Sequence, residues 1–502
     1  MSSIVYLRNP KSNTIYAYLN EPVWDPEKRK NVYKRRCIGH VDPNTGEIVP
    51  NRASRVKEFP TVRSEYLCKV LDKVSEDIHL SECLRMTFPD FWKKVASIIY
   101  YLVCTDDDLA YCQQWSVRHS TPYNQVLTPK LISEVLSTIN SNSISLFFTL
   151  WRLRLQPAET YVTRVGFGGS GSSLNQYSKN INLPLDDLND GYLLEMFVST
   201  KNNIPICYRL FDRATDRRLG DYDVNPDSFT KLSSFMDETK GDSVDPTLIA
   251  YANTNITVRI RPENEFVRPL LDKVEPTMTD PENYRLVLGT PVFTQSFMQH
   301  LNGHRYYIHF FFNPTMAAEN LSTFISVINL CKNEVMMEQT NSNHVELYSK
   351  YLIIGENEDG TSVELNSEAI MHHNKYLGYT VLVSNHTRLP SSALVPFLHN
   401  ELLSRAFDSL RNDTDGTGLN LYAGTNFLSR VFLQFLSLIL RMELEYIMDS
   451  KKLNRTYPFK TVMLELSNIL TVRTPGVKKA QNTFMTDDQI RILNAFGVQY
   501  EE

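Results

Sequence analysis

A stretch of β-branched and aromatic residues runs directly into three glycines with the spacing G-x-G-x-x-G, namely Gly166, Gly168 and Gly171. Glycines at this spacing that follow a strand can bind a phosphate. Such a site also requires a helix that begins directly after the glycines and an acidic residue about twenty positions further along the chain. Asp186 or Asp187 supplies the acid, but residues 172–184 form a poor helical sequence and no P-loop lysine follows. We therefore expect no nucleotide site here.

Hydrolytic chemistry is not supported either. Ser170 lies between two glycines, but the rest of a G-x-S-x-G nucleophile elbow is missing. The adjacent histidines His372 and His373 have no spaced set of partner residues, and we expect both at the surface. A Ser- or His-dependent hydrolase is thus not expected.

A second group with chemical potential lies near the N-terminus, where six basic residues surround Trp24 and Tyr33: Lys28, Arg29, Lys30, Lys34, Arg35 and Arg36. The flanking segments alternate or carry aromatic residues, which predicts a small β unit. Basic residues interleaved with aromatic ones on a β-ribbon suit phosphate contact combined with base stacking. The alternative is a solvated edge on which Lys and Arg prevent edge-to-edge strand pairing.

Composition and length limit the class of protein. A chain of 502 residues exceeds one ordinary core, so we expect three or more folding units. With 42% hydrophobic and 22% charged residues the composition is typical of a soluble globular protein, and a net charge of −5 argues against a surface that is basic throughout. Seven scattered cysteines without a C-x-x-C pair indicate a reducing compartment, and no zinc site is expected.

The N-terminus has no signal pattern, and the apolar helix expected over 427–442 is too short and too polar to span a bilayer. We therefore expect a soluble, cytoplasmic protein without membrane contact.

The spacing of apolar residues changes along the chain, which indicates that successive segments differ in secondary structure. From Arg63 to about Trp151 apolar residues recur at helical spacing, which predicts a helical domain. We then expect strands over 161–165, 192–200 and 206–210, a helix over 228–236 and a short strand over 247–251. A meander followed by a helix and a strand is how a ribonuclease-H-like α/β core begins.

Six stretches carry a resemblance to a known family. They read YLRNPKSNTIYAYLNEPVWDPEKRK, CIGHVDPNTGE, FPDFWKKVASIIYYLVCTDDDLAYCQQW, INLPLDDLNDGYLLEMFVSTKNNIPICYRLF, QFLSLILR and FMTDDQIRILNAFGV. In this order, and nearly end to end, the chain resembles insertion-sequence transposases of the DDE class. More closely, it resembles the branch whose ribonuclease-H-like core is split by a β-rich insertion.

The resemblance implies an α/β fold with an N-terminal small β unit and an all-helical domain before the core. By residue number, it implies a β unit with the basic ribbon (1–58), a helical domain (59–155), the first part of the core (156–262), the β-rich insertion (263–376), the second part of the core (377–450) and a C-terminal helical tail (451–502).

Transposases of this class cut and rejoin DNA with two Mg²⁺ ions held by an Asp on the first core strand, an Asp at the end of a later strand and a Glu on a helix after the insertion. In this chain FGGSGSS places Phe167 at the first position, LIAYANTNI places Tyr251 at the second, and FLHNELLSRAFDSLR places Ser404 at the third. All three metal ligands are therefore missing. Two basic residues accompany the Glu in the family. In this chain the uncharged Asn400 stands at the first of these positions, and Arg411 keeps a basic residue at the second.

Three other carboxylates are candidates to substitute for the missing ligands: Asp216, Glu401 and Asp408. Glu401, Ser404 and Asp408 share one face of a helix, and Asp216 follows the first core hairpin. Neither the first nor the later core strand offers a carboxylate near its missing Asp, and a single carboxylate on the helix cannot organise two ions. We therefore expect no catalytic residues, no bound metal and no cofactor.

The resemblance and the missing ligands together predict a catalytically silent, transposase-derived protein that binds double-stranded DNA as a regulator or scaffold. Contacts are expected from the six basic residues of the ribbon and from Asn400 and Arg411. We also expect a homodimer in the bacterial cytoplasm, associated with the nucleoid. The alternative is an active DDE transposase that uses Mg²⁺.

Overall fold

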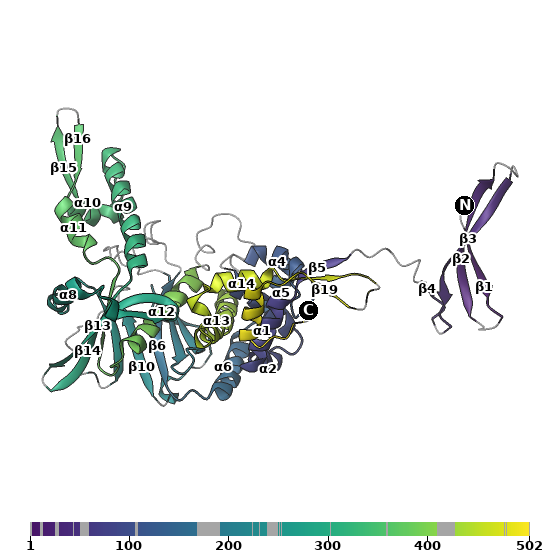
Figure 1. Ribbon diagram of the computed structural model, residues 1–502, viewed down its shortest axis with the longest axis horizontal. Coiled ribbons are helices and arrows are strands. Elements are labelled where there is room, and N and C mark those ends of the chain that lie inside the picture. Colours follow the sequence, from purple (N-terminus) through teal and green to yellow (C-terminus); the bar gives the residue numbers. More distant parts are fainter. Residues whose placement is uncertain are drawn as a thin grey trace. The chain divides into compact units, whose positions relative to one another are not determined.

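The computed structural model describes residues 3–500, apart from 11–13, 26–29, 44, 51–59, 106–108, 168–190, 223, 230, 238–248, 250–251, 253, 302, 358–359, 409–426, 476 and 478. The chain forms two compact units, one of residues 1–63 with 471–483 and the other of residues 64–470 with 484–502. Helices and sheets both contribute (Figure 1), which confirms the mixed α/β class.

The N-terminal unit is built on a four-stranded antiparallel sheet of β1 (Ser3–Arg8), β2 (Ile15–Asp25), β3 (Lys30–Val41) and β4 (Ile48–Pro50). Gly39 allows β4 to approach β3, because a Cβ at this position would lie 2.2 Å from the carbonyl oxygen of Val49. Among the described residues of these strands, Ala17 is the only fully buried apolar side chain. The sheet therefore leaves both faces largely open to solvent.

A smaller sheet has the strand order β19-β18-β5. Its strands are β5 (Thr61–Ser64), β18 (Leu470–Arg473) and β19 (Gln481–Asn482).

The larger unit begins with the predicted helical stretch: α1 (Tyr66–Asp77), α2 (Leu80–Thr87), α3 (Trp92–Cys104), α4 (Cys112–Arg118), α5 (Pro129–Thr138) and α6 (Ser141–Leu155). The residues that predicted α1 by their spacing, Leu67, Val70, Leu71 and Val74, are all buried. The helical period is therefore confirmed.

The most apolar helix, α13 (Phe427–Ser450), packs against α1 and α3, and every residue from 429 to 440 is buried. A helix that is apolar on all sides belongs in a core. Two shorter helices follow it, α14 (Phe459–Ser467) and α15 (Asp487–Ala495). None of the described helices meets the length and hydropathy needed to cross a bilayer.

A ten-stranded sheet with the order β12-β13-β14-β17-β11-β10-β6-β7-β8-β9 forms the middle of this unit. Its strands are β6 (Thr160–Phe167), β7 (Tyr192–Ser199), β8 (Pro205–Asp212), β9 (Arg217–Leu219), β10 (Leu232–Asp237), β11 (Asn255–Ile260), β12 (Tyr284–Val287), β13 (Thr290–Leu301), β14 (His304–Phe312) and β17 (Tyr379–Ser384). The first three strands form an antiparallel meander, as predicted, and β10 and β11 run parallel to β6.

The helix predicted over 228–236 is wrong. A 3₁₀ turn (Pro226–Ser228) is followed by β10, which pairs with β6 on one side and β11 on the other. Strand partners on both sides satisfy the backbone of this segment, so tertiary pairing overrides its weak local preference. The strand predicted over 247–251 lies mostly outside the described residues.

One face of the sheet is covered by α12 (Pro390–Asp408), which packs along β6 and also contacts β12, β13 and β17. A separate cluster of buried residues joins α9 (Pro314–Met336), α10 (Val345–Tyr351), β15 (Leu352–Asn357) and β16 (Gly360–Leu365), and α11 (Ser367–Asn374) packs against it. We call these five elements the insertion lobe because they lie in the sequence between the paired strands β14 and β17. The remaining helices of the described residues are α8 (Arg268–Val274) and short 3₁₀ turns at Leu109–Tyr111, Glu275–Thr277, Pro281–Asn283, Ser342–His344 and Leu453–Arg455.

Candidate functional site

The carboxyl ends of the parallel strands β6, β10 and β11 meet at one edge of the large sheet, beneath α12. Ligand sites in open α/β sheets lie at such edges. Phe167 ends β6 and Asp237 ends β10, while Arg259 lies one residue before the end of β11. These three residues define what we call the strand-end site.

Asp237 is neutralised by a neighbouring cation. The Nη1 atom of Arg259 donates a hydrogen bond to Oδ2 of Asp237 at 3.3 Å, and only 2% of the Asp237 side chain and 7% of the Arg259 side chain are exposed. The guanidinium also lies over the ring of Phe397 from α12, 4.9 Å from its centroid. The positive charge next to the Asp237 carboxylate is therefore that of an arginine side chain.

Phe167 is buried in an aromatic cluster. Its ring centroid lies 5.3 Å from that of Phe407, 5.7 Å from that of Tyr192 and 6.2 Å from that of Phe427. Rings at these separations pack favourably and exclude water. As far as the described side chains go, the end of β6 therefore offers an apolar surface and no ligand for a metal ion.

Asn400 was predicted to contact DNA, and the structure corrects this prediction. Its side chain is buried, and its Nδ2 atom donates to Oγ1 of Thr163 at 2.5 Å and to the backbone oxygen of Arg164 at 3.1 Å. The amide ties α12 to β6 because buried polar groups require such partners. It does not reach a surface where a phosphate could bind.

Of the candidate substitute carboxylates, Asp216 and Glu401 have described side chains, and neither of them lies at the strand-end site. Asp216 is exposed in the turn between β8 and β9, with a left-handed φ of 51°. Since β8 is two strands from β6, the lateral separation is about 10 Å. Glu401 lines a different pocket of about 580 Å³, together with Arg441 and Glu445 of α13.

The other positions taken from the resemblance are only partly described. Ser404 and Asp408 belong to α12, but their side chains are outside the described set, and Tyr251 and Arg411 lie outside the described residues altogether.

Buried carboxylates on the described strands of the large sheet are paired with arginines. Besides Asp237, Glu195 on β7 accepts from Nε of Arg209 at 2.6 Å and from Arg164 at 3.4 Å. Within the described part of the chain, the one group of three potential metal ligands lies elsewhere, in the insertion lobe. No two-metal carboxylate site is formed by the described side chains.

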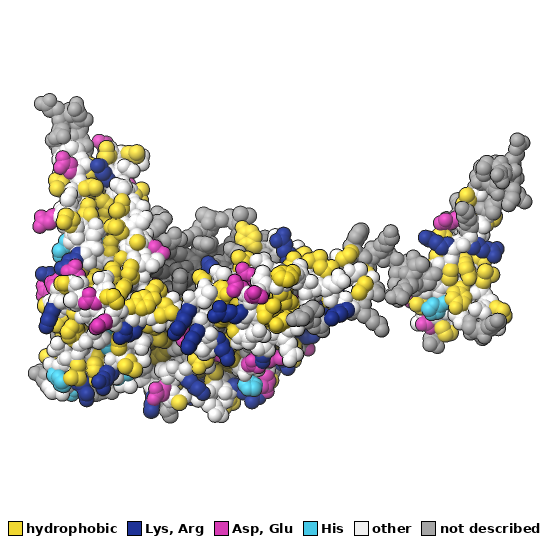
Figure 2. All heavy atoms as spheres, in the orientation of Figure 1, with side chains coloured by type: hydrophobic (Ala, Val, Ile, Leu, Met, Phe, Trp, Pro, Cys, Tyr) yellow, Lys and Arg dark blue, Asp and Glu magenta, His cyan; other side chains and the backbone are white. Residues whose placement is uncertain are grey.

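The part of the basic ribbon that the structure describes lies on β3. Arg35 and Arg36 are exposed, as is Tyr33, with 58% of its surface accessible. Lys30 and Lys34 belong to β3 but their side chains are not described, and Lys28 and Arg29 lie outside the described residues. Figure 2 shows basic side chains beside apolar ones on this sheet. The described arginines are therefore accessible to a partner.

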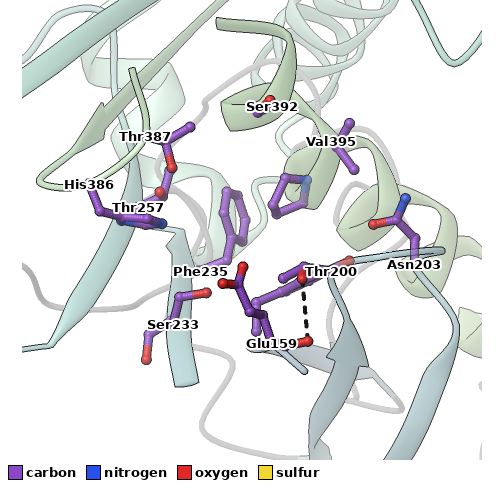
Figure 3. Close-up of a pocket in the computed structure, with 13 residues that line it drawn as sticks. Glu159, Thr200, Asn203, Ser233, Phe235, Thr257, His386, Thr387, Ser392 and Val395 are labelled. Atoms are coloured by element: carbon purple, nitrogen blue, oxygen red, sulfur yellow. Dashed lines mark hydrogen bonds between the residues drawn. The ribbon is translucent and has the colours of Figure 1, made fainter. Parts of the chain in front are cut away.

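A pocket of about 410 Å³ opens at the opposite edge of the parallel strands, near the first turns of α12. Figure 3 shows its hydroxyl-rich lining, which includes Ser233, Thr257, Thr387 and Ser392. Sequence reasoning did not find this pocket, because its residues come from segments more than 200 positions apart. Its position at the amino ends of the strands is opposite to that expected of a catalytic site.

Beneath this pocket Tyr161 and His399 join β6 to α12, with the Tyr161 hydroxyl 3.1 Å from Nδ1 of His399. Burial lowers the pKa of His399 to about 3, so the imidazole is neutral at physiological pH. His373, which was predicted at the surface, is also buried, against Phe324 and Tyr351, whereas His372 is exposed as predicted.

The sequence interpretation missed Asp237 and Arg259, because residues 228–236 were predicted as a helix. An alternative signal was present: Phe235 and Asp237 are two positions apart, as are Thr257 and Arg259, and a period of two is typical of strands. In the structure all four residues are buried.

No family model matches the chain, and no curated protein matches it. Among solved structures, a cryo-EM structure of a piggyBac transposase synaptic complex with hairpin DNA is similar to it. The likeness covers 80% of this chain and 76% of that chain, with 9% sequence identity and a TM-score of 0.24. At this TM-score the two chains are not shown to share a fold.

Proposed function

We propose that this chain is a transposase-derived DNA-binding protein that lacks the two-metal site of DDE enzymes and acts as a regulator or scaffold on double-stranded DNA. The observation that carries the proposal is the composition of the strand-end site. Two Mg²⁺ ions require clustered, ionised carboxylates. Here the end of β6 holds a buried phenylalanine, and the carboxylate at the end of β10 is paired with Arg259.

The strand order supports the fold part of this proposal. A meander of β6, β7 and β8, with β10 and then β11 added in parallel on the other side of β6, is the arrangement expected of a ribonuclease-H-like core. In that arrangement β10 is the later strand whose end carries the second Asp. We therefore propose Asp237, in place of Tyr251, as the residue at the second carboxylate position.

The N-terminal sheet supports the DNA-binding part. Tyr33 and Arg35 are two positions apart on β3, so both project from the same face, and both are exposed. An aromatic ring beside a guanidinium can combine stacking with phosphate contact. A sheet with almost no buried apolar residues of its own also presents exposed apolar side chains, which commonly mark interaction surfaces.

The binding experiment uses the full-length chain and fluorescently labelled DNA duplexes, one with the sequence that flanks the gene and one with the same bases scrambled. We expect binding at low salt without Mg²⁺, weakening as salt increases. The double variant Arg35→Ala/Arg36→Ala should reduce the slope of log K against log salt by about 1, since only Arg35 shares the face of Tyr33 and each lost phosphate contact removes about 1.

The matched control is Lys451→Ala/Lys452→Ala, which removes the same charge from two exposed residues of the larger unit. Equal losses in both double variants would show that binding follows net charge and not the ribbon. Absence of binding to either duplex at low salt would overturn the DNA-binding proposal.

The catalytic part is tested separately, by incubating the bound flanking duplex with Mg²⁺ or Mn²⁺. We expect no cleavage by the natural chain. Specific cleavage at the element end, lost in Asp237→Asn, would show that Asp237 still holds a metal and would overturn the silent assignment without affecting the DNA-binding result.

A further inference from the structure

A mixed cluster of metal-binding side chains lies in the insertion lobe, away from the strand-end site. Cys331 and Glu334 belong to α9, and His344 ends the 3₁₀ turn that precedes α10. One ligand atom of each residue lies within 4.8 Å of the other two. Cys331 is fully buried and only 3% of the His344 side chain is exposed, whereas Glu334 is partly accessible at 18%.

Local structure explains how these residues meet. Positions three apart lie on the same side of a helix, so Cys331 and Glu334 project together from α9. The chain then reverses over residues 337–341, which brings His344 back against α9. Nδ1 of His344 lies 2.8 Å from Oε2 of Glu334, and the Tyr348 hydroxyl donates to the same oxygen at 2.5 Å.

One atom of this cluster has no partner. Nε2 of His344 is buried and has no hydrogen-bond partner among the described residues. Nδ1 of His344 and Oε2 of Glu334 already face each other, so an ion placed between them can be bound by both atoms, and Nε2 then keeps the ring proton.

We propose that Cys331, Glu334 and His344 bind a divalent cation of the Zn²⁺ type. A thiolate, an imidazole and a carboxylate are the three side-chain types that Zn²⁺ prefers, and hard cations such as Mg²⁺ do not favour sulfur. On binding, the Cys331 thiol releases one proton to solvent. The ion, one thiolate, one carboxylate and a neutral imidazole then sum to zero charge, which suits a buried place.

Three protein ligands leave one tetrahedral position for water. The ion would connect the last turns of α9 to the start of α10 and so stabilise the insertion lobe. The sequence predicted no zinc site because paired cysteines are absent. A site with a single cysteine does not have that signature, and only the fold brings its ligands together.

The competing interpretation is a metal-free hydrogen-bonded group, in which Cys331 merely fills space in the core of the lobe. Titration of the full-length protein with Co²⁺ separates the two, because Co²⁺ bound to a thiolate gives a near-ultraviolet charge-transfer absorption. We expect this absorption at about one equivalent, its loss on adding Zn²⁺, and a higher melting temperature with Zn²⁺.

Cys331→Ser should abolish the thiolate absorption, while Cys104→Ser, a matched change at the end of α3, should leave it intact. Tyr348→Phe removes the hydroxyl that donates to Glu334 and accepts from the backbone N–H of Asn341, and it should weaken affinity about 10- to 100-fold without loss of the absorption. If Cys331→Ser does not fold, Glu334→Gln provides the second test, with a larger loss of affinity than Tyr348→Phe.

Two results would overturn the proposal. One is the absence of a thiolate absorption in natural protein that is folded by circular dichroism. The other is an absorption that persists unchanged in folded Cys331→Ser protein. Neither result bears on DNA binding.

Discussion

Arg259 on β11 and Asp237 on β10 form a buried ion pair at the carboxyl ends of two parallel strands, with 3.3 Å between Nη1 and Oδ2. Removing two charges from water is costly, and the pair is tolerated because each charge compensates the other. The guanidinium is further held against the ring of Phe397. This pair gives the strand-end site a structural role that requires no metal ion.

Removing one partner of this pair should be strongly destabilising. We expect Arg259→Met to lower the free energy of unfolding by about 3–5 kcal/mol, because it leaves Asp237 buried and uncompensated. Urea unfolding followed by circular dichroism measures the change. Lys231→Met is the matched control, since it breaks the exposed ion pair with Glu159 and should have little effect on stability.

The double variant Asp237→Asn/Arg259→Met should recover part of the stability lost in Arg259→Met. A loss in Arg259→Met as small as that in the lysine control would contradict the structural role of the buried pair.

Asn400 should affect stability and leave DNA binding unchanged. Replacement by Ala removes its two donated hydrogen bonds to β6, and we expect a loss of about 1–3 kcal/mol. The salt dependence of DNA binding measured on the folded variant should match that of the natural chain. A reduced salt slope in Asn400→Ala would instead restore its assignment as a phosphate contact.

Glu443 on α13 should make stability decrease as pH rises. Burial, and secondly the negative charge of Asp77, raise the pKa of Glu443 from the usual 4.5 to about 7. The folded protein therefore binds more protons than the unfolded chain between these values. The contribution is fully present below about pH 4.5 and is lost as pH rises through about 7.

Glu443→Gln removes this titration. We expect it to raise the free energy of unfolding at pH 8 by roughly 1–2 kcal/mol, a figure discounted for partial solvent access, and to have little effect at pH 4.5. Chemical unfolding at the two pH values provides the measurement. Equal effects at both would show that the carboxylate does not titrate in this range.

Gly39 should be required for the N-terminal sheet. In Gly39→Ala the added Cβ would collide with the carbonyl oxygen of Val49, so we expect β4 to separate from β3. Faster amide hydrogen exchange in β3 and β4, with an unchanged α13, would show this. Gly166→Ala is the control, because a Cβ there meets only the flexible end of the Arg213 side chain.

If the basic ribbon on β3 depends on this sheet, Gly39→Ala should also weaken DNA binding. Unchanged exchange rates in β3 and β4 would contradict the close approach of the two strands.

Periodicity by itself determined the elements whose contacts are local. The spacing of Leu67, Val70 and Leu71 predicted α1, and the apolar run after residue 427 predicted the buried helix α13. The meander of β6, β7 and β8 was also predicted, because its strands carry strong local preferences and follow one another in sequence. In these elements neighbours along the chain supply most of the information.

Only the tertiary structure decided which side chains meet. β10 became a strand because β6 and β11 lie on either side of it, and that pairing placed Asp237 beside Arg259. Asn400 was buried by β6, more than 230 positions earlier in the chain. Such contacts depend on partners that are distant in sequence, and the residue types at one position do not specify them. The family's metal-binding positions lie at the ends of the parallel strands. In this chain, the side chains that meet there are determined by packing, which only the folded structure reveals.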